Sequence, residues 1–160
     1  MKLSTLCYCL TDERILLALK KKGFGEGKWN GMGGKVEAGE TVVQAAVREL
    51  EEEVGLMAQD KDLQLVAVIK FFMAGECVSE CQVFFVRVWT GEPIESEEMK
   101  PQWYSIDKLP FDGMWPGDRV WLPLLLAGKK IQGEEYLDAS GQILEKFEWK
   151  ELSSRNNFSR

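Results

Sequence analysis

The sequence contains no histidine among its 160 residues. This absence excludes a Ser-His-Asp or Cys-His nucleophile system, and it excludes any zinc site that uses imidazole ligands. Acid–base chemistry must therefore use carboxylates, lysine, tyrosine or cysteine. A metal site built without histidine and cysteine has only oxygen ligands, which suits Mg²⁺, Mn²⁺ or Ca²⁺.

Basic residues are too few for a protein that binds DNA or RNA polymers. Lys and Arg number 20 against 26 Asp and Glu, which gives a net charge of −6. Such a chain lacks the positive surface that phosphate backbones require, so we expect no nucleic-acid polymer as a partner. A small phosphorylated ligand remains compatible with this charge if a metal ion supplies the positive charge locally.

The four cysteines lack the C-x-x-C spacing of zinc ribbons and redox pairs. Cys7 and Cys9 lie two apart in a strand-like stretch, and Cys77 and Cys81 flank a segment interpreted as a loop. We expect free or buried thiols, with a metal or disulfide role as the alternative.

The longest apolar run, 120–127, is too short to cross a bilayer, and the first residues lack the apolar core of a signal peptide. We therefore expect a protein without a membrane segment, in the cytoplasm or in another reducing compartment.

The order of the expected elements predicts an α+β fold with a mixed sheet between helices. Helices are expected over residues 41–54 and 118–126, and residues 20–39 are expected to form an ordered functional loop. Strands are expected where β-branched and aromatic residues cluster, over residues 3–10, 15–19, 63–73, 81–89, 131–137 and 143–152. The chain is expected to form one domain over 1–152, followed by a polar tail at 153–160 that frays.

The helix expected at 41–54 has well-marked ends and two distinct faces. Thr41 and Gln44 form a capping-box pattern, and Gly55 stands where a C-terminal glycine belongs. One stripe is apolar and should face the core, namely Val43, Ala46, Val47, Leu50 and Val54. A different face gathers three carboxylates, those of Glu49, Glu52 and Glu53.

These three glutamates can be explained in two ways. Like charges three and four residues apart repel by roughly 0.2–0.5 kcal/mol per pair, and Arg48 offsets only part of that repulsion. A solvated acidic face is the ordinary explanation. The alternative is a divalent-cation site, in which the metal relieves the repulsion. The glycine-rich segment 31–40 directly before the helix favours the cation site, because glycines expose backbone groups to a ligand.

The loop and helix together match the Nudix box, whose pattern is G-x5-E-x7-R-E-U-x-E-E-x-G-U with U an aliphatic residue. Every specified position is filled, by Gly34, Glu40, Arg48, Glu49, Leu50, Glu52, Glu53, Gly55 and Leu56. The chain therefore resembles the Nudix hydrolases of the MutT kind.

The resemblance implies an α/β/α sandwich in which the box forms a loop–helix–loop. It also implies hydrolysis of a nucleoside-diphosphate-linked substrate with Mg²⁺, or alternatively Mn²⁺, as cofactor. The implied metal ligands are Glu49, Glu52, Glu53 and the carbonyl oxygen of Gly33. Glu49 is also a candidate general base, and Arg48, with Glu40, would brace the loop against the helix.

Three further segments, 20–31, 93–103 and 114–126, are similar to the animal Nudix enzymes that hydrolyse oxidised purine nucleoside triphosphates. This similarity implies that Asn30 binds the base edge, that Trp115 stacks on the purine and that Asp118 reads the base edge, with a proton on its carboxyl as one option. The other substrate-binding residues that it implies are Thr5, Lys20, Phe24 and Phe71. Glu98 is implied as an extra metal ligand or base from a separate loop.

Each of these assignments has a plainer alternative. Asn30 could form a tight turn with Gly31, and Trp115 could pack in the core. Asp118 could cap the second helix, alone or while also reading the base. Glu98 could belong to a solvated acidic loop.

The chain departs from the animal enzymes at one position. They carry two adjacent Asp residues after the Trp-Pro pair, whereas the first of these positions is Gly117 here. One of two base-reading carboxylates is therefore expected to be missing. Since discrimination among oxidised purines depends on such polar contacts, we hypothesise loss of recognition for some oxidised adenines.

The resulting functional hypothesis is a Mg²⁺-dependent pyrophosphohydrolase. It would convert an oxidised purine triphosphate such as 8-oxo-dGTP to monophosphate and pyrophosphate and so prevent DNA damage. One alternative is another substrate, such as a dinucleoside polyphosphate or a nucleotide sugar. Another is a non-catalytic nucleotide-binding module, which the complete set of helix glutamates argues against. The similarity to short single-domain enzymes indicates a monomer.

Overall fold

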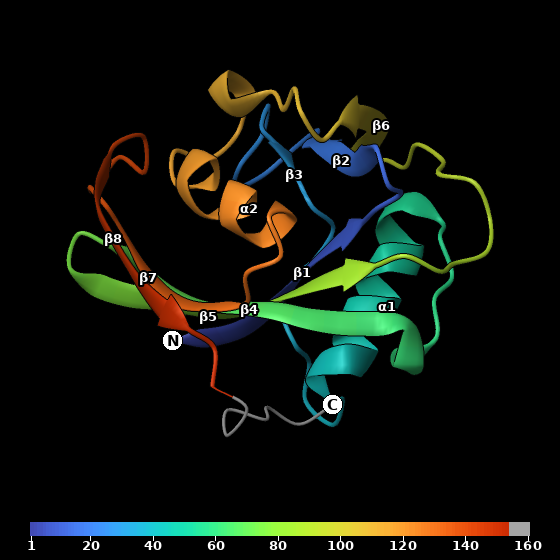
Figure 1. The fold of residues 1–160 in the computed structure, drawn as a ribbon, viewed down its shortest axis with the longest axis horizontal. Helices are drawn as coiled ribbons and strands as arrows, with labels where there is room; N and C mark the ends of the chain where they lie inside the picture. Colours follow the sequence, from blue (N-terminus) through green and yellow to red (C-terminus); the bar gives the residue numbers. More distant parts are fainter. Residues whose placement is uncertain (154–160) are drawn as a thin grey trace.

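Two β-sheets and two α-helices make up residues 1–153, the part of the chain that the computed structural model describes (Figure 1). The polar tail predicted for 153–160 lies, apart from Ser153, outside the described residues. The strands and helices, in order, are β1 Lys2–Cys9, β2 Arg14–Lys20, β3 Trp29–Asn30, α1 Val42–Val54, β4 Leu63–Met73, β5 Glu76–Val86, β6 Met99–Ser105, α2 Asp118–Leu126, β7 Ile131–Leu137 and β8 Leu144–Glu151. Short 3₁₀ turns η1 and η2 cover Asp60–Asp62 and Phe111–Gly113.

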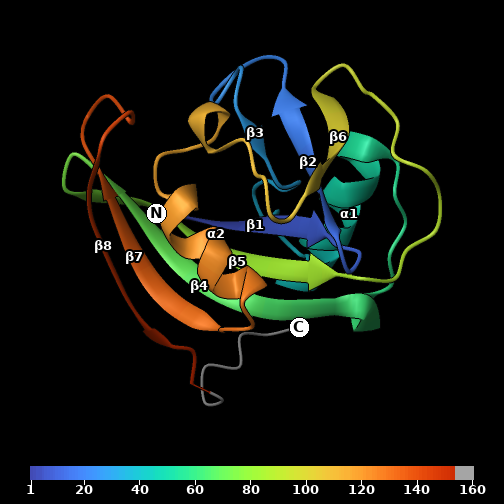
Figure 2. The same cartoon turned by 45° about the horizontal axis from the view of Figure 1, so that its top comes forward.

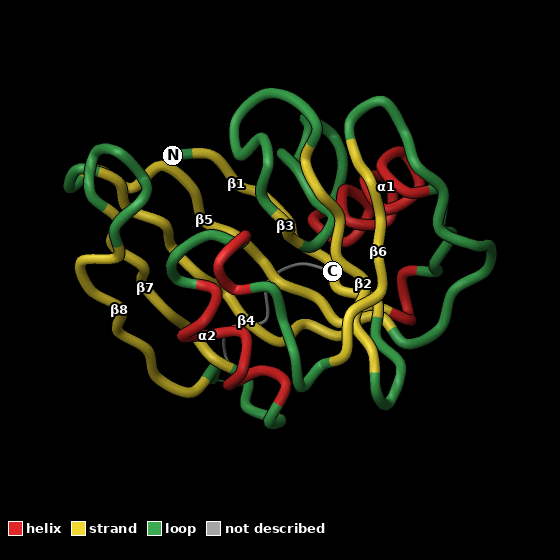
Figure 3. The backbone as a smooth tube through the Cα atoms, turned by 90° about the horizontal axis from the view of Figure 1, so that it is seen from above, coloured by secondary structure: helices red, strands yellow, loops and turns green. Residues whose placement is uncertain are grey.

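The larger sheet is mixed, as predicted. Its strand order is β1-β5-β4-β7-β8, with β1/β5 and β4/β7 parallel and the other neighbours antiparallel. The smaller sheet has the order β3-β2-β6 and is antiparallel. In Figure 2, α2 lies over β4 and β5 on one side of the larger sheet, and α1 lies behind β1. Seen from above in Figure 3, α1 and the β7–β8 hairpin lie at opposite ends of the molecule.

The larger sheet separates two apolar cores. Successive residues of a strand point to opposite faces. Leu6 and Tyr8 of β1 therefore pack on the side that carries Trp121 of α2. Cys7 and Cys9 point the other way and pack with α1. A helix thus covers each face of the sheet, and the predicted α+β fold with an α/β/α arrangement is confirmed.

Helix α1 begins and ends as its sequence predicts. The hydroxyl of Thr41 accepts a hydrogen bond of 3.1 Å from the backbone N–H of Gln44, and the side chain of Gln44 accepts one of 2.8 Å from the backbone of Thr41. Gly55 ends the helix in the left-handed region, with φ of 74°. The predicted stripe is buried except for Val47, which is partly exposed.

The loop before α1 is attached to β1 by backbone hydrogen bonds. Thr5 donates to the carbonyl of Gly34 at 2.9 Å, and Cys7 and Met32 exchange bonds of 2.6 and 2.9 Å. A Cβ atom at Gly33 would overlap the carbonyl oxygen of Thr5. Glycine is therefore required for this close approach, which fixes the loop relative to the sheet.

Three strands differ from their predictions. β3, only two residues long, lies within the segment 20–39 that was expected to form a loop. β5 begins at Glu76, so Cys77 and Cys81 lie within a strand, and the loop predicted between them is wrong. The turn before β5 consists of Ala74 and Gly75, whose φ values are 51° and 83°, and it lacks the Asn-Gly or Asp-Gly pair that marks hairpins. β6 was not predicted because it contains Pro101. Proline is tolerated there because β6 is an edge strand.

The cysteines form no disulfide within residues 1–153. All four cysteines are unpaired, and three of them are buried. Within residues 1–153, no helix is long and apolar enough to cross a membrane.

The capping box yields a stability prediction. Thr41→Ala removes the hydroxyl that satisfies a backbone N–H of the first turn, so the free energy of unfolding should fall by about 1 kcal/mol. Urea unfolding measures this change. Glu51→Ala, at an exposed position of the same helix, is the control and should change stability by less than about 0.5 kcal/mol. Equal stability of the wild type and Thr41→Ala would contradict a capping role.

Candidate functional site

A cavity of about 520 Å³ lies between β1, the loop before α1, and the segment that leads into α2. Gly33 of the Nudix-box loop lines it. Its wall also contains all of the residues that the sequence predicts as substrate-binding, namely Thr5, Lys20, Phe24, Asn30, Phe71, Trp115 and Asp118. These residues come from strands, a helix end and loops far apart in the sequence, so the fold brings together what residue spacing alone does not.

Asn30 presents one half of its amide to this cavity. Its Oδ1 accepts hydrogen bonds from the Tyr8 hydroxyl at 3.2 Å and from the backbone N–H of Gly31 at 2.8 Å. The two Nδ2 hydrogens are therefore the part of the amide that can serve a ligand. Asn30 also pairs with Ala18 of β2, so the alternative in which it forms a tight turn with Gly31 is wrong.

Trp115 forms an aromatic wall of the cavity and is partly exposed. Phe24 lies beside it, with ring centroids 5.1 Å apart, and the side chain of Phe24 is 73% exposed. The ammonium group of Lys28 lies 5.2 Å from the Trp115 ring centroid. The Trp115 ring offers a stacking surface for a planar base, and the Lys28 ammonium group beside it offers a positive charge for a phosphate.

Asp118 is buried at the start of α2, with only 3% of its surface exposed. Gly117 holds the N-cap position, and no side chain caps this helix, so the capping alternative for Asp118 is wrong. The Oδ2 atom is buried and has no hydrogen-bond partner among the described residues. Burial, and then the nearby carboxyl of Glu135, raises the pKa of Asp118 well above its ordinary value. The arrangement therefore favours a protonated carboxyl.

Glu135 of β7 belongs to the same cavity and was not predicted from the sequence. It is 1% exposed, lines the cavity, and its Oε1 accepts a hydrogen bond of 3.0 Å from the indole N–H of Trp121. A signal for it does exist in the sequence. β7 buries alternate residues, and a carboxylate among them points to a special role. The other members of this buried set are Ile131, Gly133 and Leu137.

Glu53 of α1 lies behind the loop that lines the cavity. It is 3% exposed, and its Oε1 accepts a hydrogen bond of 3.0 Å from the backbone N–H of Gly33. Its Oε2 is buried without a partner in the described part of the chain. Burial, and then the adjacent carboxyl of Glu49, raises the pKa of Glu53. A buried, unpartnered oxygen beside a second carboxylate suits a cation, which would stabilise the charged form.

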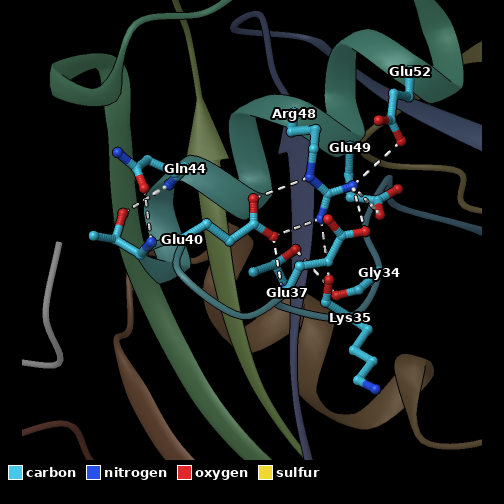
Figure 4. A network of polar contacts seen from close by, with 10 residues as sticks. Gly34, Lys35, Glu37, Glu40, Gln44, Arg48, Glu49 and Glu52 are labelled. Carbon is cyan, nitrogen blue, oxygen red and sulfur yellow. Dashed lines mark hydrogen bonds and ion pairs between the residues drawn. The ribbon is translucent and has the colours of Figure 1, made fainter.

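Arg48 links the loop to the helix through a network of charged hydrogen bonds (Figure 4). Its guanidinium donates to Glu40 at 2.7 and 3.1 Å and to the carbonyl of Lys35 at 3.2 Å. It also donates to Glu49 at 2.9 Å and to Glu52 at 3.3 Å. These contacts lower the pKa of Glu40, chiefly through the hydrogen bond from Arg48. The position of Arg48 fits the bracing role that the resemblance implies.

The oxygen ligands near α1 are carboxylates and a backbone carbonyl, which suit a hard divalent cation. Their positions among residues 1–153, however, do not form a closed coordination sphere. The carbonyl of Gly33 accepts no backbone hydrogen bond from the described residues. However, no three acidic or cysteine side chains within 1–153 converge closely enough to hold a metal ion. Glu49 and Glu52 both turn toward Arg48. A bound cation would therefore compete with Arg48 for these carboxylates.

Glu98 is exposed, and it is not among the residues that line the cavity. Its backbone carbonyl accepts a hydrogen bond of 2.8 Å from Lys21, and its N–H donates to the Ser96 hydroxyl at 3.3 Å. Nearby, Glu95 forms an ion pair with Lys21. The residue that follows Glu98, Met99 at the start of β6, does line the cavity.

The buried carboxyl of Glu135 yields a prediction about pH. Burial raises its pKa from 4.5 to about 7. The folded protein therefore binds this proton more tightly than the unfolded chain, and the resulting stability is complete below pH 4.5 and lost as the pH rises through about 7. Glu135→Gln cannot titrate and keeps an acceptor for Trp121.

Thermal or urea unfolding at pH 5 and pH 8 measures this effect. Between these values the wild type should lose up to roughly 3 kcal/mol more stability than Glu135→Gln, at about 1.4 kcal/mol per pKa unit. Parallel stability curves for the two proteins would show that Glu135 does not titrate in this range.

Comparison with known proteins identifies the family of the chain. The chain matches the NUDIX domain family over residues 1–125. It is 49% identical over 133 residues to the oxidized purine nucleoside triphosphate hydrolase of Danio rerio, a match that covers 82% of this chain and 84% of that protein. The protein of the same name from Mus musculus is 46% identical with the same coverage.

The fold itself is similar to the crystal structure of a mutator MutT protein from Bacillus halodurans. The TM-score is 0.78 at 24% identity, covering 93% of this chain and 97% of that one. Together with the complete box on α1 and its preceding loop, these matches show that the chain belongs to the Nudix hydrolase family.

Proposed function

We propose that this protein is a Mg²⁺-dependent pyrophosphohydrolase of oxidised purine nucleoside triphosphates of the 8-oxo-dGTP type. The observation that carries the proposal is the double role of Gly33. It lines the cavity that holds Asn30, Trp115 and Asp118, and its N–H binds the buried carboxylate of Glu53. A nucleotide whose base enters the cavity would therefore carry its phosphates toward the acidic helix.

The reaction consumes one water molecule. The water oxygen forms a bond to phosphorus, one phosphoanhydride P–O bond breaks, and the monophosphate and pyrophosphate leave. Phosphoryl transfer of this kind depends on positioning and charge neutralisation rather than on covalent help from the protein. Mn²⁺ could replace Mg²⁺, and either ion would neutralise phosphate charge and lower the pKa of the attacking water.

The chain's own residues perform the remaining tasks. Glu52, Glu53 and the carbonyl of Gly33 would hold the cation. Glu49 would hold the cation or accept a proton from water. Arg48 would hold Glu49 and Glu52 in position through its hydrogen bonds to them, and its bond to Glu40 would attach the loop to the helix. Glu98 would supply a further metal ligand or a base from its separate loop.

Different residues around the cavity would bind different parts of the nucleotide. Trp115, beside Phe24, provides a stacking surface for the base. The Nδ2 group of Asn30 donates to an acceptor on its edge, and Asp118 meets another part of that edge. Lys20 supplies positive charge in the cavity wall. Thr5 and Phe71 complete the wall.

We further propose that residues 1–152 act as one domain, as a monomer in the cytoplasm, where the enzyme would remove damaged nucleotides from the DNA precursor pool. The cavity is built from elements between β1 and β7 of a single chain. A homogeneous monomer mass in solution supports this, and a stable dimer overturns the monomer assignment.

Substitutions in α1 provide a direct test of the proposed function. Pyrophosphate release from 8-oxo-dGTP with Mg²⁺ should fall by roughly 100-fold or more in Glu53→Gln, since even the residues that only orient metal ligands cost ~10–100-fold when removed. Glu51→Gln removes a charge from an exposed position of the same helix and should retain activity.

Thermal unfolding separates catalysis from folding in the same variants. Without Mg²⁺, Glu53→Gln should be about as stable as the wild type, because glutamine keeps an oxygen acceptor for the Gly33 N–H and burial already disfavours the charged form of Glu53. Added Mg²⁺ should raise the melting temperature of the wild type but not of Glu53→Gln. Equal activity of the two proteins, or equal stabilisation by Mg²⁺, would overturn the metal site.

A substrate panel tests the nucleotide class. The kcat/KM for 8-oxo-dGTP should exceed that for dGTP, for a dinucleoside polyphosphate and for a nucleotide sugar. The physical reason is a cavity whose wall holds buried polar groups that only a matching base edge satisfies. A preference for the nucleotide sugar or the dinucleoside polyphosphate would reassign the substrate within the family. No hydrolysis of any of them, together with nucleotide binding, would indicate a non-catalytic module.

A further inference from the structure

Position 117 is a glycine for a reason other than backbone conformation. Its φ of −77° and ψ of −18° are helical, and any residue adopts them. The limitation is space. A Cβ atom on Gly117 would overlap the Oε1 and Cδ atoms of Glu135, closer than unbonded atoms approach. The carboxyl group of Glu135 thus occupies the volume in which a side chain at position 117 would begin.

The carboxyl of Glu135 is held firmly in this place. The indole N–H of Trp121 donates to its Oε1 at 3.0 Å, and Trp121 itself is 1% exposed. Glu135 lines the same cavity as Asp118, and each of these residues is at most 3% exposed. The second oxygen of Asp118, Oδ2, is buried without a partner among the described residues. Two buried carboxyl groups therefore border one cavity, and part of their hydrogen-bonding capacity is unused.

Two neighbouring buried carboxyls cannot both carry a charge at low cost. The pair therefore retains a proton, which gives one O–H donor and at least one carboxylate acceptor. The edges of purine bases place an acceptor beside a donor, such as O6 beside N1–H in guanine. In 8-oxoguanine, N7 also carries a hydrogen and becomes a donor. A protonated carboxyl next to an ionised one complements such an edge.

We propose that Glu135 is a specificity-determining residue, which together with Asp118 reads the edge of the oxidised guanine base. The proposal deepens the proposed function and rests on it. β7 supplies a carboxyl group at the place where the related animal enzymes are expected to carry an Asp at position 117. The base-reading carboxylate is then relocated to another strand rather than lost, and Gly117 is the residue that makes room for it.

The relocation can be tested by moving the carboxylate. The variants are Gly117→Asp, Glu135→Ala and the double variant, and the readout is the ratio of kcat/KM for 8-oxo-dGTP to that for dCTP. Both substrates share the triphosphate and the sugar. Glu135→Ala should lower this ratio by roughly tenfold or more, which corresponds to about 1.4 kcal/mol. Gly117→Asp alone should lower the melting temperature, because its side chain collides with Glu135.

The double variant should recover much of the melting temperature that Gly117→Asp loses and much of the selectivity ratio that Glu135→Ala loses. Glu135→Ala frees the volume for the side chain at position 117, so the melting temperature should rise above that of Gly117→Asp. The selectivity ratio should rise above that of Glu135→Ala. This non-additivity is the expected signature of two positions that compete for one volume.

Two further variants keep the test decisive. Glu135→Gln preserves size and an acceptor for Trp121 but removes the carboxylate, so it should lower the selectivity ratio even if Glu135→Ala fails to fold. Glu134→Gln changes the neighbouring residue, which points away from the buried side of β7. It is the matched control and should leave the ratio unchanged.

The outcomes separate this inference from the function on which it rests. An active wild type whose selectivity ratio is unchanged in Glu135→Gln would overturn the role of Glu135 and leave the proposed function standing. An equal loss for both substrates would also overturn it, because a purely structural defect affects them alike. A wild type that hydrolyses neither 8-oxo-dGTP nor dCTP would overturn the proposed function, and this inference with it.

Discussion

The close approach of the glycine loop to β1 is the constraint on which the site depends. At Gly33 the loop lies so near the carbonyl of Thr5 that no side chain fits between them. The backbone bonds from Thr5 to Gly34 and between Cys7 and Met32 fix the loop in that place. Gly33 of this loop lines the cavity, and its N–H donates to Glu53 of α1. The position of the base cavity relative to the acidic helix follows from this contact.

Buried carboxyl groups are the second organising feature. The sequence has no histidine, and the structure buries the carboxyl groups of Glu53, Asp118 and Glu135 almost completely. Each is costly to bury when charged, and two of them have an oxygen without a partner among the described residues. Buried polar groups that the protein leaves unsatisfied are typical of sites that a ligand completes. A ligand that forms hydrogen bonds to these oxygens, or binds a cation against them, would remove this cost and so gain binding free energy.

The sequence predicted best where local signals are strong. The capping box and the C-terminal glycine gave the bounds of α1 to within one residue, because these signals act within a single turn. The glutamate face of α1 was placed by helical periodicity, and its chemistry by the resemblance to the Nudix box. Residue spacing alone did not separate a metal site from a solvated acidic face.

What escaped prediction depends on tertiary context. β6 contains Pro101, which a sheet tolerates only at an edge strand or a bulge, and its edge position depends on pairing with β2. The hairpin before β5 turns on Ala74 and Gly75, which carry no standard signal. Glu135 became part of the site only when β7 was placed beside β4 and its inward face met α2. Position 117 shows the same limit, since its glycine is explained by a residue on another strand.

The most direct test of the account is where a bound metal lies relative to the base. The broadening of amide and indole signals by Mn²⁺ can be measured by NMR in the presence of a non-hydrolysable 8-oxo-dGTP analogue. The account predicts strong broadening at the amides of Gly33 and Glu53 and weaker broadening at the indole of Trp115, because the loop places the cation beyond the base. Broadening centred on Trp115, or absent from the loop and α1, would contradict it.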